Sequence, residues 1–144
     1  MCDSLEDPHN LGAILRSAEA AGVHGVIIPK RNSVTLNYTV AKTSAGAIEY
    51  VPVVKVANLP AAIDELKSRG VWIFGADMDG TDYTALDYSG SIALVIGSEG
   101  KGIGRLVREK CDFIASLPMR GKINSLNASV AAGILMFEAA KHRN

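Results

Sequence analysis

Three segments of the sequence carry residue types that could bind a small molecule or act on one. They are residues 7–16, 94–104 and 117–129. Each combines glycine, amide or hydroxyl residues with a neighbouring apolar run, the pattern of a loop that joins a strand to a helix. In α/β proteins, loops of this kind gather ligand-binding groups at one edge of the sheet. These three segments are therefore the candidates for a functional site.

In the first segment, Asn10 stands where a side chain caps a helix, and Arg16 follows near the second turn of that helix. Two interpretations are open. Asn10 is a cap and Arg16 a solvated side chain, or Arg16 grips a phosphate, for which a forked guanidinium is well suited. His9 lies beside them and is interpreted as a local turn residue.

In the second segment, four glycines within eight residues follow an apolar run: Gly97, Gly100, Gly102 and Gly104. Glycine lets the backbone approach a ligand closely. Neither the phosphate loop GxxxxGK[ST] nor the dinucleotide pattern GxGxxG is present. Glu99 would repel a phosphate, so the loop suits a neutral or cationic ligand; a flexible turn is the alternative.

In the third segment, Ser125 and Asn127 both stand where helix caps are favoured, and capping alone could explain them. The residues that follow, 130–137, are almost all small or apolar. A helix that is apolar nearly all round is buried, either in the core or against another subunit.

The composition is that of an ordinary globular domain. The 144 residues are 48% hydrophobic and 21% charged, with a net charge of zero, which fits one domain. Bulk charge gives no sign of nucleic-acid binding, so an RNA partner would need a local patch. Six basic residues that flank the second and third segments are either solvated surface or such a patch: Lys101, Arg105, Arg108, Lys110, Arg120 and Lys122.

The two cysteines, Cys2 and Cys111, have neither metal-ligand spacing nor a CxxC pattern. We interpret them as reduced thiols, which predicts a cytoplasmic protein without a bound metal. No apolar run is long enough to cross a membrane, and acidic residues stand where a signal peptide would need basic ones.

Short apolar runs alternate with helical patterns along the chain. We expect strands at 23–28, 50–56, 71–76, 92–96 and 113–117. We expect helices at 11–21, 38–47, 59–69, around 106–107 and at 127–141, and a loop at 77–90. This alternation predicts an α/β fold with a mostly parallel sheet flanked by helices. Residues 1–5 give only a fragment of a first strand, so we expect an excised domain or a truncated product.

Taken together and in this order, the three segments resemble the motifs of the SpoU/TrmH family of RNA ribose methyltransferases, within the SPOUT superfamily. The resemblance runs from Asp7 to Ala139. Its motif residues are Asn10, Arg16, Gly97, Glu99, Gly100, Gly102, Pro118, Met119, Gly121, Ser125, Leu126 and Asn127. Residues 42–47 and 51–53 further resemble the bacterial subgroup that modifies a guanosine of 23S ribosomal RNA. Two departures from the family pattern are expected to matter: Ala128 stands where Val is frequent, and we expect the amino-terminal RNA-binding domain common in that subgroup to be missing from this chain.

The resemblance implies that residues 1–144 are a single SPOUT catalytic domain with a C-terminal trefoil knot, working as a homodimer. The implied reaction moves a methyl group from S-adenosylmethionine to a ribose 2′-hydroxyl of RNA, with 23S ribosomal RNA as the expected target. A tRNA 2′-O-methyltransferase and a non-catalytic RNA-binding or assembly module are the alternatives. A flavodoxin-like flavin or nucleotide binder is disfavoured, because no Ser/Thr-rich phosphate loop follows the first strand.

The resemblance also assigns roles to residues. The catalytic set is Arg16, Asn10, Glu99, Ser125 and Asn127. The cofactor-binding set is Gly75, Gly97, Gly100, Leu117, Met119, Ser125 and Leu126. Because a guanidinium holds its proton tightly, holding the RNA phosphate and stabilising the developing alkoxide is a safer role for Arg16 than general base.

Overall fold

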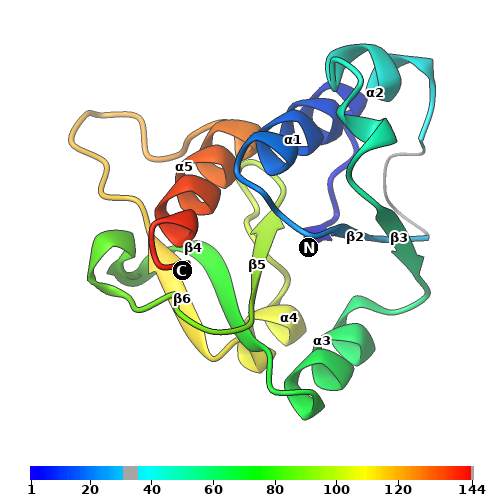
Figure 1. Ribbon diagram of the computed structural model, residues 1–144. Helices are drawn as coiled ribbons and strands as arrows, with labels where there is room; N and C mark the ends of the chain where they lie inside the picture. The colour runs from blue at the N-terminus through cyan, green and yellow to red at the C-terminus, as the bar shows by residue number, and fades with distance from the viewer. Residues whose placement is uncertain (31–35, 144) are drawn as a thin grey trace.

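The computed structural model describes residues 1–30 and 36–143, in which strands and helices alternate (Figure 1). The strands are β1 (Cys2–Asp3), β2 (Val26–Pro29), β3 (Val53–Val56), β4 (Trp72–Asp82), β5 (Ile92–Gly97) and β6 (Phe113–Ser116). The α-helices are α1 (Pro8–Ala20), α2 (Tyr38–Thr43), α3 (Leu59–Ser68), α4 (Arg105–Lys110) and α5 (Ala128–Ala140). Single 3-10 turns cover Ala47–Glu49 and Tyr83–Ala85.

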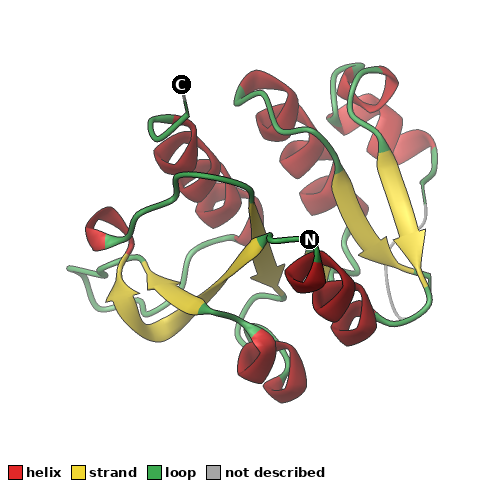
Figure 2. Cartoon of the chain, turned by 60° about the horizontal axis from the view of Figure 1, so that its bottom comes forward, coloured by secondary structure: helices red, strands yellow, loops and turns green. Residues whose placement is uncertain are grey.

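The strands form a sheet of order β1-β5-β4-β6 and a separate pair, β2-β3, and these strands pair in parallel throughout. Helices flank the strands (Figure 2). The expectation of a mostly parallel α/β fold is confirmed, whereas the knot stays a prediction. Because parallel strands end at the same edge, the loops after β1, β4, β5 and β6 are brought together there.

Three sequence expectations about secondary structure were wrong in detail. Asp7, not Asn10, caps α1: its side chain accepts a hydrogen bond from the backbone N–H of His9, and Pro8 fills the first turn. The expected loop at 77–90 is instead strand as far as Asp82, because β6 pairs with this stretch. The second helix ends at Thr43, since Ala45 and Gly46 adopt positive φ.

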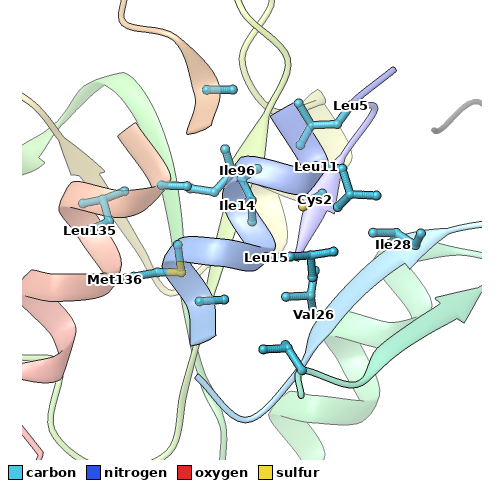
Figure 3. Close-up of a cluster of buried hydrophobic side chains, with 14 of the residues drawn as sticks. Cys2, Leu5, Leu11, Ile14, Leu15, Val26, Ile28, Ile96, Leu135 and Met136 are labelled. Carbon is cyan, nitrogen blue, oxygen red and sulfur yellow. The ribbon is translucent and has the colours of Figure 1, made fainter. Parts of the chain in front are cut away.

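The main core lies between α1, α5 and the strands (Figure 3). Leu11, Ile14 and Leu15 on one face of α1 are fully or almost fully buried. They pack in the same cluster as Val26 and Ile28 of β2 and Leu135 and Met136 of α5: Figure 3 shows α1 between these two elements. This packing fixes the amino end of α1 beside the carboxyl end of β5.

The last helix, α5, is apolar nearly all round but is buried on only one side. Ala132, Leu135 and Met136 face the core, whereas Val130 and Phe137 are 49% and 51% exposed. The sequence offered two interpretations of this helix, the core or another subunit, and the structure assigns one face to the core. None of the described helices is long and apolar enough to cross a membrane.

Candidate functional site

A cavity of about 150 Å³ lies where β5 and β6 end, between the second and third segments. Ile96, Leu117 and Leu126 are among the apolar residues that line it. The polar residues in its lining are Asp77, Ser98, Glu99, Lys101, Asn124 and Ser125. An apolar slot with a few polar groups is the usual form of a small-molecule site.

The glycine loop that borders this cavity is tightly built. Ser98 and Gly102 form an isolated antiparallel bridge, and Gly100 and Gly102 have φ of 80° and 67°. A Cβ on Gly97 would stand 2.2 Å from the backbone of Gly102. Glycine is therefore required at these positions, which favours a shaped ligand loop over a flexible turn.

Glu99 connects all three segments through one oxygen. Its Oε1 accepts hydrogen bonds from Asn10 Nδ2 at 3.4 Å, Asn127 Nδ2 at 2.9 Å and the backbone N–H of Ala128 at 3.3 Å. Asn10 is buried inside α1, whereas Glu99 is exposed at the rim of the cavity. The carboxylate thus fixes two amide side chains beside the cavity; these residues are called the Glu99 cluster below.

Asn127 has two tasks at once. Its Oδ1 accepts from the backbone N–H groups of Ser129, at 2.9 Å, and Val130, at 3.3 Å, so it caps α5. Its Nδ2 donates to Glu99. Ser125 does not cap the helix and instead lines the cavity.

Arg16 lies away from the cavity. It is exposed and does not line the cavity, and it has no hydrogen bond or ion pair with any residue in 1–30 or 36–143. Six residues advance a helix by about 9 Å and turn it by about 240°, so Arg16 points to a different side of α1 from Asn10. Within one chain, the structure does not bring Arg16 to the other predicted catalytic residues.

Six of the seven predicted cofactor-binding residues line the cavity: Gly97, Gly100, Leu117, Met119, Ser125 and Leu126. Gly75 does not. A Cβ at this position would lie 2.8 Å from both Cys111 Sγ and Ile103 Cδ1, so Gly75 allows core packing on the other side of β4. Its neighbour Ala76 lines the cavity instead.

Neither cysteine is placed as a nucleophile. Burial raises the pKa of the Cys111 thiol to about 11, and nearby Asp112 adds to the shift. Burial also raises the pKa of Cys2. Both thiols are therefore protonated at neutral pH. Among the described residues, no group of three or more His, Cys, Asp or Glu side chains could hold a metal.

The six basic residues do not form one free patch. Arg108 forms an ion pair with Asp77, and Lys110 binds Asp64 at 2.8 Å. Lys101 is exposed at the cavity, and Arg120 and Lys122 are exposed in the loop after β6.

Four polar residues that line the cavity were in neither the predicted catalytic set nor the cofactor-binding set: Asp77, Ser98, Lys101 and Asn124. Asp77 follows a buried strand directly, which is a signal that sequence reasoning could have used. It was missed because residues 77–90 were interpreted as an ordinary polar loop.

The model of the SpoU rRNA Methylase family matches residues 1–137. The chain belongs to this family. The predicted resemblance is confirmed, and the cavity lies between two of the motifs that carried it.

Relatives in this SpoU family match almost the whole chain. A protein of Bacillus subtilis (strain 168), whose name places it in the TrmH family of tRNA/rRNA methyltransferases, is 58% identical over 143 residues, 99% of this chain and 57% of its own length. The chain therefore spans little more than half the length of such curated relatives.

Two solved structures share the fold closely. The SpoU methyltransferase AviRb from Streptomyces viridochromogenes, in complex with AdoMet, is 31% identical with a TM-score of 0.90, covering 97% of this chain and 58% of AviRb. A protein described as an RNA 2′-O ribose methyltransferase is 26% identical with a TM-score of 0.87, covering 98% of this chain and 54% of that one.

Proposed function

We propose that this domain transfers a methyl group from S-adenosylmethionine (AdoMet) to a ribose 2′-hydroxyl of RNA. The observation that carries the proposal is the Glu99 cluster, in which one carboxylate oxygen joins the three motif segments at the rim of an apolar cavity. The AdoMet complex of AviRb and the name of the 2′-O ribose methyltransferase support the donor and the acceptor.

The residues around the cavity fit AdoMet. Leu117 and Leu126 offer apolar surface for a flat adenine, and the glycine loop brings backbone groups close to it. Glu99 gives the rim a carboxylate, which suits a ligand with a cationic centre better than a phosphate. When bound, AdoMet supplies an activated methyl group on its sulfonium.

The remaining difficulty of the reaction is the 2′-hydroxyl, which is a weak nucleophile while it keeps its proton. The Glu99 cluster holds the amides of Asn10 and Asn127 in fixed positions, and the Ser125 hydroxyl lies in the cavity lining. Fixed donors and acceptors of this kind orient a hydroxyl without reorganising during the reaction. We assign these side chains to positioning the ribose.

Arg16 reaches the site in this proposal from a second copy of the chain. Ser17 of α1 lies against Gly133 of α5, so the exposed sides of these helices adjoin. That surface carries Arg16 together with the exposed Val130 and Phe137; we call it the α1–α5 face. Covering its apolar residues with a second copy would stabilise a homodimer and place Arg16 outside its own chain's cavity.

The RNA backbone meets this domain, we propose, at Lys101, Arg120 and Lys122, which are exposed beside the cavity. Each phosphate contact makes affinity fall as salt rises. Ribosomal RNA is the proposed target because residues 42–47 and 51–53 resemble the 23S-modifying subgroup. Residues 1–144 are proposed to be the catalytic domain. Its preference between RNA substrates is best measured in parallel with that of a longer relative.

The first experiment titrates the folded chain with AdoMet by calorimetry and then supplies radiolabelled AdoMet with 23S ribosomal RNA or tRNA. We expect saturable AdoMet binding near one site per chain. We also expect the labelled RNA to resist alkaline cleavage after the modified nucleotide, because a 2′-O-methyl group removes the hydroxyl that attacks the phosphodiester. If only tRNA is labelled, tRNA and not ribosomal RNA is the substrate. A folded chain without AdoMet binding would contradict the proposal and favour the non-catalytic module.

The homodimer is tested by mixing two inactive variants, Arg16→Ala and Leu126→Arg. Half of the dimers in an equal mixture are mixed, and each has one intact cavity that faces an intact Arg16. We therefore expect about a quarter of the wild-type activity. No recovery, with dimers present by light scattering, would show that Arg16 serves its own chain.

A further inference from the structure

Residues 77–80 form a bulge in β4, where the pairing with β6 shifts register, next to the cavity. Ala115 of β6 pairs with Ala76 on one side of the bulge and with Thr81 on the other. Asp77 and Met78 line the cavity. The bulge is therefore a wall of the ligand site, and something must hold it in place.

Arg108 of α4 makes the principal polar contacts to this bulge. Its Nη1 forms an ion pair with Asp77 Oδ2, and its Nη2 donates to the backbone carbonyl of Asp79 at 3.0 Å. The two side chains are only 34% and 25% exposed. A forked guanidinium is the side chain that can make both contacts together.

Two further contacts fix the wall without contacting Arg108. Ser116 Oγ donates to the carbonyl of Met78 at 2.9 Å, and Asp77 Oδ1 accepts from the N–H of Met78 at 2.7 Å. Gly80 leaves room for β6, since a Cβ there would lie 2.5 Å from the carbonyl oxygen of Ile114. The Asp77 carboxylate is thus held through both oxygens, by the Met78 N–H at Oδ1 and by Arg108 at Oδ2, and Arg108 is the contact that comes from another element.

Asp77 is also next to the glycine loop. A Cβ on Gly102 would lie 3.4 Å from Asp77 Oδ1. Because α4 begins directly after this loop, Arg108 ties the wall from β4 to the wall from β5. The two sides of the cavity are thereby joined by one ion pair.

We propose that Arg108 is a positioning residue for AdoMet: through Asp77 and Asp79 it sets the wall of the cavity against which the cofactor binds. The inference rests on the function proposed above. It gives Arg108 a different role from the RNA contact that the sequence suggested. Arg105, on the same short helix, provides the contrast, since it is 91% exposed with one ion pair at 3.9 Å.

The test compares Arg108→Met, Arg108→Lys and Arg105→Met by calorimetry with AdoMet. We expect Arg108→Met to weaken binding by about tenfold, equivalent to about 1.4 kcal/mol. Arg108→Lys keeps a charge beside Asp77 and should recover at least half of that loss. Arg105→Met should bind like the wild type.

A double-variant cycle separates positioning from general stability. Asp77→Asn should weaken AdoMet binding about as much as Arg108→Met, and the double variant should be little worse than either, because both remove the same contact. Additive losses would overturn the inference, as would wild-type affinity in Arg108→Met. If Arg108→Met does not fold, Arg108→Lys and Asp77→Asn decide in the same way. A wild-type chain that does not bind AdoMet would remove the proposed function itself.

Discussion

The Glu99 cluster and the α1–α5 face begin on the same helix but are organised in opposite ways. Asn10, near the start of α1, is buried and bonded to Glu99, which also holds Asn127. Arg16, further along α1, is exposed and has no partner in the described ranges. The cluster is complete within one chain.

This difference teaches where each motif obtains its geometry. The Glu99 cluster is fixed by hydrogen bonds between segments that are distant in sequence. The α1–α5 face offers a cation beside exposed apolar side chains, and we propose that a second copy of the chain covers this surface. The predictions below separate the two regions, from the largest expected effect to the smallest.

Arg16→Ala should reduce methyl transfer by about 10³-fold, because the variant lacks the cation proposed to stabilise the developing alkoxide. AdoMet affinity should stay within about twofold, since Arg16 does not line the cavity. Radiolabel transfer and calorimetry measure the two effects. A large loss of AdoMet affinity would show that Arg16 also contributes to the cofactor site, and would contradict the separate roles proposed for the two regions.

Leu126→Arg should weaken AdoMet binding by about 10²-fold, because a bulky charged side chain would enter the apolar slot. The matched control is Ile123→Arg in the same loop, where the side chain is 75% exposed and does not line the cavity. Equal affinities for the two variants would show that the slot has been misplaced.

Glu99→Gln should lower transfer by about tenfold, since the amide keeps one acceptor oxygen but loses the charge that strengthens its bonds to Asn10, Asn127 and Ala128. Glu99→Ala should lose more, because it leaves the buried Asn10 amide unsatisfied. We expect the order to appear in the rate constant and in the melting temperature. A Glu99→Ala variant as active as Glu99→Gln would speak against the positioning role.

The smallest effect concerns stability at high pH and should touch neither region. Burial raises the pKa of Tyr88 to about 12 and that of Cys111 to about 11, above the unfolded values of 10.0 and 9.0. Burial is favourable only while both groups are neutral. Their contribution to the free energy of unfolding is therefore complete below pH 9 and is lost as pH rises from 9 to 12. The melting temperature should therefore be flat from pH 7 to about 9 and then fall.

Cys111→Ala is the variant that checks this dependence. It should reduce the fall that begins near pH 9, to which the buried Cys2 thiol also contributes, and leave AdoMet affinity at pH 8 unchanged. A fall of the same size and onset in the variant would assign the titration to another group.

The alternation of strands and helices could be predicted from the sequence, because a helix with one buried face and a fully buried strand each have a characteristic spacing of apolar residues. The buried face of α1 at Leu11, Ile14 and Leu15 is such a pattern, and so is the apolar β5. The glycine requirement at Gly97 and Gly102 was also visible as composition, although its cause, a close backbone approach, was not.

Other features could not be read in this way. Asn10 and Asp7 are both good caps. Asp7 caps α1, whereas Asn10 lies inside the helix and donates to Glu99, a partner 89 residues away that the sequence does not show. Gly75 and Ala76 are neighbours on β4, and only the packing of Cys111 and Ile103 shows which one faces the cavity.

By itself, then, the sequence determined the fold class, the three motif segments and seven of the residues that line the cavity. The tertiary structure alone decided that Glu99 joins these segments, that Arg108 is committed to Asp77 and that Arg16 points away. The physical reason is that periodicity records what each residue does for its own element. A hydrogen bond or ion pair between distant elements involves a single pair of residues, so it produces no repeating pattern in the sequence.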